Sequence, residues 1–344
     1  MGYSFSMTRH LPAHVPAHVS TPGVSHVLAP VLPDELTDKV GELRQASKSA
    51  NTRRAYKSDW SQWATWCEAQ GIVSMPAHPQ SVCAYLADKA GKVKVSTLTR
   101  HLATISKAHE VAGFASPCKA AEVKDTLAGL RNTYGTARRE APGLLRDALR
   151  LTLDNLGGDL SGTRDRALLL TGWCAGLRRS ELAGLTWGDL LPDPDGLVLV
   201  LRKSKTDQAG QGRSVGLFRE TDQVACPVQA LDTWRVSLAK QSPLAVAPTA
   251  PVFPRVNRWG QVLPGAMSGQ SIAEVVQRRT EQAGLTTRYQ GHSLRKGLVQ
   301  QATLAGVADS AVMATTGHQS VTMLRRYQST AGLVSRAASK GLLA

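Results

Sequence analysis

The chain has 344 residues, 42% hydrophobic and 19% charged, so it can form two domains of ordinary size that bury a core. Lysine and arginine number 41 against 26 acidic residues, and this net charge of +15 favours a polyanionic partner such as nucleic acid. The five cysteines form no C-x-x-C pair, and neither a run of about 18 apolar residues nor a secretory signal is evident. These features argue against a disulfide framework, a zinc site and a membrane span, and we expect a cytoplasmic protein with reduced thiols.

Residues 1–33 hold five prolines and four histidines among small and aliphatic residues. Proline at this density sustains neither a helix nor a central strand. The histidines, His10, His14, His18 and His26, are irregularly spaced, which favours a solvated tail over a metal site. We predict a disordered Pro/His-rich arm.

Residues 34–135 carry helical periodicity throughout. Tyr56, Trp60, Trp63 and Cys67 recur at spacings of four, three and four, which is one apolar stripe of a helix. Further helices are expected over 79–90, 96–112 and 120–133. The pattern predicts a compact bundle of four or five helices.

Basic residues are spread over the predicted outer faces of this bundle. Each one alone is typical of a solvated surface, but together with the serines and threonines near 94–100 they favour a DNA-facing surface. The candidate DNA contacts are Arg53, Arg54, Lys57, Lys94, Arg100 and Lys107, and Lys92 and Lys119 add to the same charge.

Residues 136–143 are predicted to be a linker because Pro142-Gly143 interrupts the helical pattern. Residues 144–344 form a second predicted domain, again mostly helical. Its one clear β signal is the run from Gly196 to Lys205, followed by a glycine-rich turn and a second strand from Arg213. The expected fold class is mainly α with a small β-hairpin or sheet, α+β.

Two segments of the second domain place charged residues at the predicted start of a helix or at the tip of a hairpin. In the stretch 171–185, Arg178 and Glu181 are three residues apart, so on a helix the carboxylate can orient the guanidinium. An arginine beside a helix start suits bidentate phosphate binding. Lys205, at the tip of the predicted hairpin, becomes a candidate general acid if the hairpin reaches over a substrate.

Two later segments carry histidines. His292 and Arg295 are three residues apart and are expected on one helix face. His318 follows Gly317, and Tyr327 lies nine residues beyond it, a spacing that would point the two apart on a straight helix. A turn at Gln319-Ser320 is therefore predicted to bring them together.

In this order, the four segments resemble the catalytic domain of the tyrosine recombinase or phage integrase family. The resemblance covers about 144–330, including the stretch that begins Cys226-Pro-Val-Gln, and the preceding bundle resembles the family's core-binding (SAM-like) domain. The matching positions are Arg178, Lys205, His292, Arg295, His318 and Tyr327.

The resemblance implies that Tyr327 attacks a DNA phosphodiester and forms a 3′-phosphotyrosyl intermediate with a free 5′-hydroxyl. It implies Lys205 as general acid for the leaving oxygen. It implies that His292 assists proton transfer at the tyrosine or binds phosphate. The phenol, with an ordinary pKa near 10, must lose its proton as it attacks.

The resemblance further implies that Arg178, Arg295 and His318 hold the phosphate and that Glu181 orients Arg178. Preorganised cations around the non-bridging oxygens are usually the largest catalytic contribution. Neither a cluster of acidic residues for two metals nor a Walker-type segment occurs, so we expect no metal and no other cofactor.

The leading hypothesis is a site-specific recombinase, bacterial or phage-encoded, that acts through a Holliday junction. It would bind inverted half-sites as a dimer and synapse as a tetramer, and the amphipathic stretch 333–343 would dock on a neighbouring subunit or simply end as a frayed helix. Two alternatives remain: a type IB topoisomerase-like enzyme, and a non-catalytic DNA-binding protein. We also expect the bundle and the catalytic domain to clamp the duplex between them.

Overall fold

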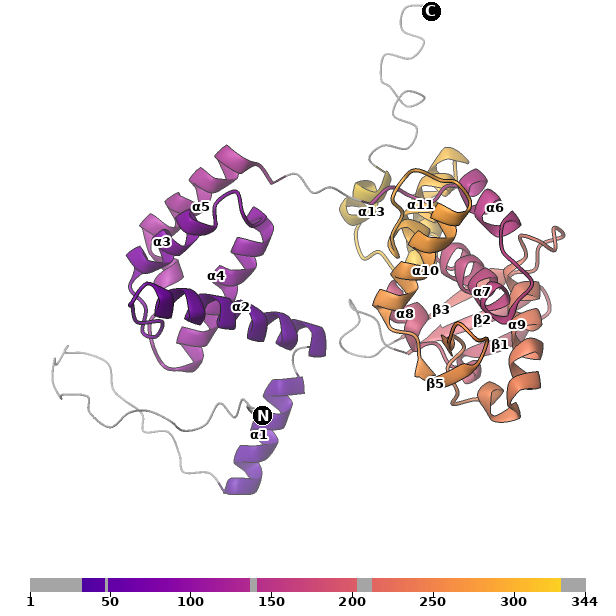
Figure 1. Ribbon diagram of the computed structural model, residues 1–344, viewed down its shortest axis with the longest axis horizontal. Helices are drawn as coiled ribbons and strands as arrows, with labels where there is room; N and C mark the ends of the chain where they lie inside the picture. The colour runs from indigo at the N-terminus through magenta and orange to yellow at the C-terminus, as the bar shows by residue number, and fades with distance from the viewer. Residues whose placement is uncertain (1–32, 47–48, 137–140, 203–211, 329–344) are drawn as a thin grey trace, which may run out of the picture. The chain divides into compact units, whose positions relative to one another are not determined.

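The computed structural model describes residues 33–46, 49–136, 141–202 and 212–328 (Figure 1). The predicted arm, Lys205 and the stretch 333–343 lie outside the described residues. The chain divides into two compact units, with the boundary after Arg138. This boundary falls inside the segment 136–143, and that each unit is a separate folding domain stays a prediction.

In the described residues of the first unit, every regular element is a helix (Figure 1). Helix α2 packs against α4, and α3 packs against α5. The predicted helices are confirmed to within a residue at each end. Its elements are α1 (Asp34–Ala46), α2 (Ala50–Ala69), α3 (Pro79–Lys89), α4 (Val95–Val111), the short 3₁₀ helix Pro117–Lys119 and α5 (Ala121–Tyr134).

Aromatic side chains fill the centre of this bundle. Trp63 is fully buried and meets the edge of the Tyr85 ring at 5.2 Å between centroids, with Leu98 and Ile105 buried beside them. Tyr56 and Trp60 are half-buried, so the predicted stripe does face the core. Burial of such side chains is the main stabilising contribution to a bundle of this size.

A buried carboxylate lies on the same helix as the stripe. Asp59 accepts two hydrogen bonds from the Arg100 guanidinium, at 2.7 and 2.8 Å, and one from the Thr104 hydroxyl at 3.3 Å. Nε2 of His101 lies 3.2 Å from the carboxylate, while Nδ1 of that ring shares a hydrogen bond with the Tyr85 hydroxyl. Arg100 was expected to contact DNA; the structure gives its guanidinium an intramolecular partner, and the DNA contact stays a prediction.

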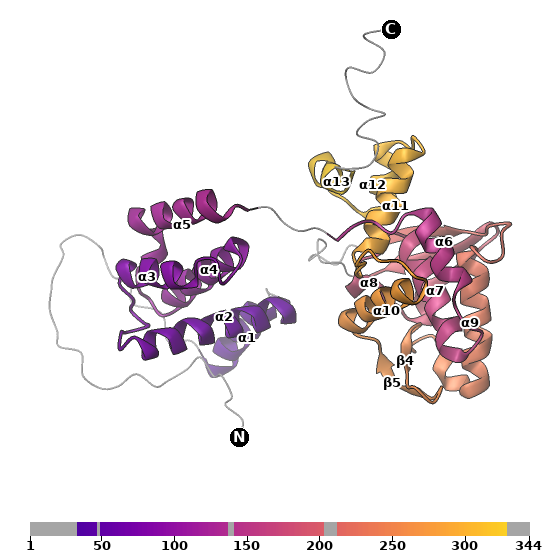
Figure 2. The ribbon, with the colours of Figure 1, turned by 45° about the horizontal axis from the view of Figure 1, so that its top comes forward.

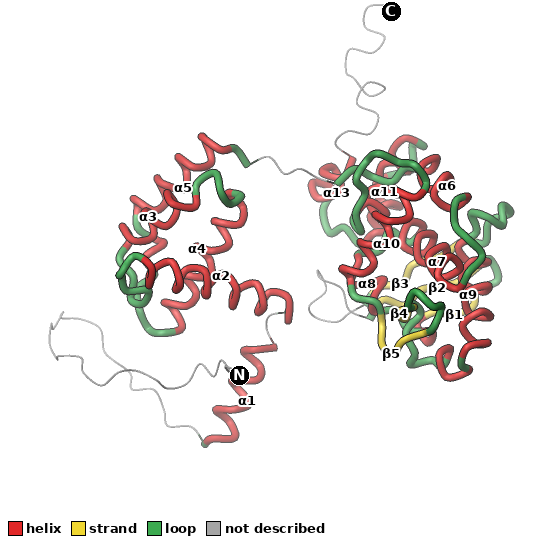
Figure 3. Tube along the Cα trace, viewed as in Figure 1, coloured by secondary structure: helices red, strands yellow, loops and turns green. Residues whose placement is uncertain are grey.

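The second unit is helical with two small antiparallel sheets (Figures 2 and 3). Its helices are α6 (Arg146–Asp154), α7 (Leu160–Cys174), α8 (Arg179–Gly184), α9 (Pro227–Gln241), α10 (Gly269–Gln282), α11 (Ser293–Leu304), α12 (Asp309–Thr316) and α13 (Val321–Gln328), with short 3₁₀ helices at Trp187–Asp189 and Pro243–Val246. Its strands are β1 (Leu190–Asp193), β2 (Gly196–Leu201), β3 (Arg213–Phe218), β4 (Pro254–Val256) and β5 (Val262–Ala266).

The sheets exceed the single hairpin that we expected. The β2–β3 pair is confirmed, with Leu199 opposite Val215, but β1 adds a third strand and β4–β5 form a separate pair. Strand β1 is short and mostly exposed, and β4 and β5 each contain a proline, so none shows the alternation that marks a strand in sequence. The strand β2 also ends at Leu201, short of the predicted Lys205.

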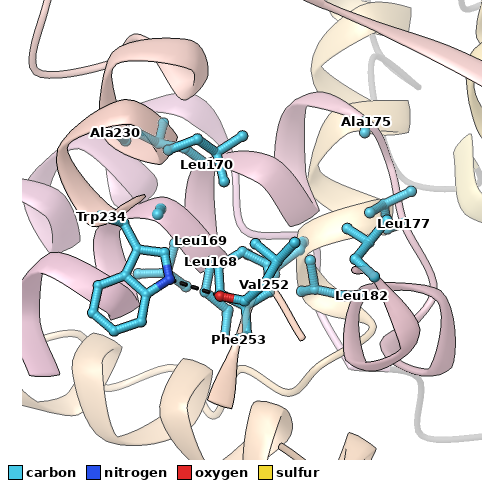
Figure 4. Packing of buried hydrophobic residues seen from close by; sticks show 14 of the residues in the cluster. Leu168, Leu169, Leu170, Ala175, Leu177, Leu182, Ala230, Trp234, Val252 and Phe253 are labelled. Atoms are coloured by element: carbon cyan, nitrogen blue, oxygen red, sulfur yellow. Dashed lines mark hydrogen bonds between the residues drawn. The ribbon is translucent and has the colours of Figure 1, made fainter. Parts of the chain in front are cut away.

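Helix α7 runs through the centre of the second unit and contacts α8, α9 and α11. Leu168, Leu169 and Leu170 are consecutive and all buried (Figure 4). On the neighbouring α9, the indole nitrogen of Trp234 donates a 2.7 Å hydrogen bond to the Val252 carbonyl. A helix buried on every side gives a rigid base for the loops that follow it.

Within the described residues, we find no helix of the length and hydropathy needed to cross a membrane.

Candidate active site

The first part of the site is a turn after α7. Gly176 has φ +57°, and a Cβ there would lie 2.9 Å from side-chain carbons of Leu298 and Thr316, so only glycine fits. The turn places Arg178 as the residue that caps the N-terminus of α8. We expected Arg178 and Glu181 to share a helix face; instead Arg178 precedes the helix, which corrects that prediction.

Glu181 holds Arg178 at two points. One carboxylate oxygen accepts the Arg178 backbone N–H at 2.8 Å, and the other accepts its guanidinium at 2.6 Å. The Glu181 side chain is almost completely buried, whereas that of Arg178 keeps some exposure. A charged pair with several hydrogen bonds fixes the direction of the guanidinium.

Arg213, at the start of β3, adds a guanidinium that sequence reasoning missed. It donates to Glu181 at 3.2 Å and to the carbonyl of Thr315. It also passes close to Gly317, whose φ is +67° and where a Cβ would lie 2.9 Å from Nε of Arg213. No motif marks this arginine in the sequence, since its partners lie about 30 and 100 residues away along the chain.

Arg295, on α11, is buried behind this pair with 1% exposure. It donates to the Gly176 carbonyl at 2.7 Å and to Nε2 of His318 at 3.1 Å. His318 follows the left-handed Gly317 that ends α12, and its ring lies 4.9 Å from the Tyr327 ring on α13. The predicted turn after His318 is confirmed, because α13 begins only at Val321.

The structure therefore brings five of the predicted residues together: Arg178, Glu181, Arg295, His318 and Tyr327. Arg295 interacts electrostatically with Arg178, Glu181 and Tyr327, so these four side chains lie close to one another. His292 is exposed and precedes α11 rather than lying on its face, which corrects the shared-face prediction. Lys205 lies outside the described residues.

Burial and mutual repulsion shape the ionisation of this cluster. Burial, and next the charge of Arg178, lower the pKa of Arg295 to about 10, so it stays charged at neutral pH. Burial, and next the charges of Arg295, Arg178 and Arg213, lower the pKa of His318 to about 4. Burial also lowers the pKa of Arg213, against the opposing charge of Glu181.

The guanidinium groups of Arg178, Arg213 and Arg295 carry three positive charges. Glu181 supplies one negative charge and the His318 ring is neutral, so two positive charges near Tyr327 are left uncompensated. Buried excess charge of one sign binds and stabilises a partner of the opposite sign. Nε of both Arg213 and Arg295 is buried without an acceptor. The arrangement suits an anion that gains negative charge during reaction.

The candidate DNA contacts of the first unit are all exposed. Three lie near the start of α2 and three along α4, two helices that pack together. Arg54 bonds to Asn51 and Lys107 pairs with Glu110. Among the described parts of the chain, no group of three or more His, Cys, Asp or Glu side chains gathers as a metal site, and all five cysteines are free thiols.

Residues 144–332 match the model of the phage integrase family, which is more than half of the chain. An integrase/recombinase XerD homologue of Selenomonas ruminantium is 31% identical over 299 residues, covering 86% of each chain. Tyrosine recombinase XerD of Mycobacterium leprae is 30% identical over 199 residues, 55% of this chain and 57% of that one.

Solved structures share the fold. A lambda integrase fragment in a dimer bound to a COC′ core site superposes with a TM-score of 0.57 at 16% identity, over 86% of this chain and 94% of that one. The XerH recombinase bound to a palindromic difH substrate gives 0.56 at 16% identity, over 78% and 73%.

The chain belongs to the phage integrase family. It is a tyrosine recombinase, a DNA strand transferase that carries out site-specific recombination. The topoisomerase-like and non-catalytic alternatives are not favoured.

Proposed function

We propose that Tyr327 is the nucleophile of this recombinase and that Arg178, Arg295 and His318 bind the scissile phosphate. The observation that carries the proposal is the convergence of these side chains, from four separate segments, around a buried excess of two positive charges. A phosphodiester carries one negative charge, and its pentacoordinate transition state carries two. The charge of the site therefore matches the transition state better than the ground state.

The chemistry is a pair of transesterifications. The phenolic oxygen of Tyr327 bonds to phosphorus as its proton leaves to His292, and the bond from phosphorus to the 5′-oxygen breaks. Lys205 gives the leaving oxygen its proton. The 3′-phosphotyrosyl bond keeps the energy of the original linkage, so a 5′-hydroxyl from a second duplex can attack it and rejoin the strand through a Holliday junction. Neither metal nor nucleotide enters the scheme.

DNA binding and assembly complete the proposal. The relatives of this fold include XerH on a palindromic substrate, and a lambda integrase tetramer on a Holliday junction superposes with a TM-score of 0.56. By analogy, two copies of this chain bind inverted half-sites and two such pairs form the synapse, with the stretch 333–343 joining neighbours. The first unit binds DNA as the core-binding domain, and the reaction takes place in the cytoplasm.

The chemical test uses a nicked suicide substrate that carries the cognate site. The wild type should form a covalent protein–DNA adduct and recombinant joints. Tyr327→Phe should bind the same DNA but form neither adduct nor joints, because phenylalanine lacks the phenolic oxygen that attacks phosphorus. Tyr289→Phe, which removes the hydroxyl of a different, buried tyrosine of the same unit, is the control. An adduct formed by Tyr327→Phe would overturn the assignment.

The binding test uses salt. Each phosphate contact releases counterions, so the slope of log affinity against log salt falls by about one for each contact that is lost. Replacing Arg53, Arg54 and Lys57 by glutamine should weaken binding to any sequence and reduce that slope by about three. Unchanged slopes would show that the start of α2 does not contact the DNA backbone.

A further inference from the structure

The two hydrogen bonds of His318 determine where its proton sits. Nε2 lies 3.1 Å from Nη2 of Arg295, and a guanidinium can only donate. Nε2 must therefore accept, which it can do only without a proton. The lowered pKa keeps the ring neutral at pH 7, so its single N–H is on Nδ1.

Thr316 is the acceptor for that N–H. Its hydroxyl oxygen lies 2.7 Å from Nδ1 of His318 and 2.6 Å from the Val312 carbonyl one turn earlier in α12. A carbonyl only accepts, so the hydroxyl hydrogen points to Val312 and the oxygen is left to accept from His318. Thr316 is fully buried, so water cannot replace it.

These hydrogen bonds form a relay in which every group donates to the next. Arg295 donates to His318, His318 to Thr316, and Thr316 to the backbone of α12. The charged groups that face the imidazole come from every neighbouring element: Arg295 from α11, Arg178 before α8 and Arg213 from β3. Tyr327 of α13 lies against the ring.

We propose that Thr316 is a positioning residue that holds the proton of His318 on Nδ1 and thereby presents Nε2 to the phosphate site. The role toward phosphate rests on the proposed function, whereas the tautomer is a property of the free protein. In the DNA complex, the phosphate charge offsets the three guanidinium groups. Nε2 then takes a proton, and the Nε2–H and the Arg295 N–H both donate to phosphate oxygens instead of to each other, while Nδ1–H keeps its partner.

Valine shows why the hydroxyl matters. It has the shape of threonine but gives Nδ1–H no acceptor, and a buried polar group without a partner is costly. Moving the proton to Nε2 would set it donor to donor against the Arg295 N–H, so no tautomer satisfies both ring nitrogens. Either the ring or the guanidinium must turn away, and the phosphate site loses its geometry.

The first experiment examines the free, full-length protein. Long-range ¹H–¹⁵N correlation spectra of the histidine rings distinguish a protonated from an unprotonated ring nitrogen, and the signal missing in His318→Gln identifies His318. The wild type and Thr316→Ser should show Nδ1–H alone, whereas Thr316→Val, whose ring turns away from its fixed partners, should show a mixture of Nδ1–H and Nε2–H. An Nε2–H tautomer in the wild type overturns the proposal, whether or not any variant folds.

The second experiment measures single-turnover cleavage of the suicide substrate. Thr316→Ser should stay within about threefold of the wild type, and Thr316→Val should cleave about 10- to 100-fold more slowly at unchanged DNA affinity, the range seen when a supporting hydrogen bond is removed from a site. Equal loss in the serine and valine variants overturns the role of the hydroxyl. If Tyr327→Phe still forms adduct while the tautomers are as expected, the proposed function fails and the tautomer assignment stands.

Discussion

Both units of the molecule contain a buried carboxylate that pairs with arginine, and Asp59 of the first unit and Glu181 of the second give opposite charge balances. In the first unit, Asp59 takes both hydrogen-bonding arms of Arg100, so the charges cancel. In the second unit, Glu181 is shared by Arg178 and Arg213, and Arg295 lies nearby without a carboxylate of its own. The neutral Asp59–Arg100 pair links two helices, whereas the cluster around Glu181 keeps a net positive charge that can bind an anion.

The difference shows how to tell a structural ion pair from a functional one. A buried carboxylate and arginine occur in both places, so neither burial nor residue type distinguishes them. What distinguishes them is the net charge: Glu181 is shared by two guanidinium groups with Arg295 nearby, and Nε of both Arg213 and Arg295 is buried without an acceptor. Desolvated groups left unpaired are costly to the fold, which points to a role in binding.

The largest effect is expected for Arg295→Lys. A lysine keeps the charge but cannot donate to both Gly176 and His318 in the guanidinium geometry. Cleavage of the suicide substrate should fall about 100- to 1000-fold, the usual loss for one preorganised donor, while DNA affinity stays within a few-fold. Arg164→Lys, which alters another buried arginine of the same unit, is the control for mere destabilisation. Equal cleavage losses in the two variants would contradict the assignment.

Substitution of Asp59 should mainly change stability, and substitution of Glu181 should mainly change the rate of cleavage. Asp59→Asn leaves the half-exposed Arg100 without its ion pair, and we expect unfolding of the first unit to become easier by about 2 to 3 kcal/mol. Glu181→Gln should instead slow cleavage about 10- to 100-fold, because its amide group opposes the N–H donors of Arg178 and Arg213. Urea unfolding and single-turnover cleavage, measured on both full-length variants, check the comparison. It fails if the same variant shows the larger loss in both assays.

Acid should destabilise the second unit through His318. Its pKa is about 4 in the folded protein and about 6.5 when unfolded, so the unfolded chain takes the proton first. The stability is complete above pH 6.5 and is lost as the pH falls towards 4, by about 3 kcal/mol. His318→Gln should lack this part of the pH dependence in thermal unfolding. Parallel curves for the two proteins would contradict the buried neutral imidazole.

The smallest effect is expected for Arg213→Lys. This residue acts through Glu181 and the end of α12 rather than on the phosphate itself, so cleavage should fall about tenfold, or about 1.4 kcal/mol. The pH profile of cleavage should stay in place, because lysine keeps the positive charge that helps to lower the pKa of His318. Arg202→Lys, at an exposed arginine paired with Asp189, is the matched control. If cleavage fell no more in Arg213→Lys than in the control, Arg213 would have no role in the active site.

The sequence by itself determined the family, the helical fold class and the order of the segments that carry Arg178 through Tyr327. It did so because residue type and spacing survive in short motifs, and because a turn after His318 is the simplest way to join it to Tyr327. Helix boundaries in the first unit were equally accessible, since an apolar stripe repeats every three or four residues.

Only the tertiary structure decided which polar groups meet. Arg213, Thr316 and Asp59 carry no motif, and their partners come from distant segments or from a turn whose direction depends on a single glycine. Charge balance likewise depends on the three-dimensional arrangement. Nothing in the sequence separates Arg100 from Arg178, yet Arg100 is neutralised by Asp59, whereas Arg178 lies in a cluster with excess positive charge. Hydrogen-bond direction and net charge arise from packing, and short-range spacing cannot encode them.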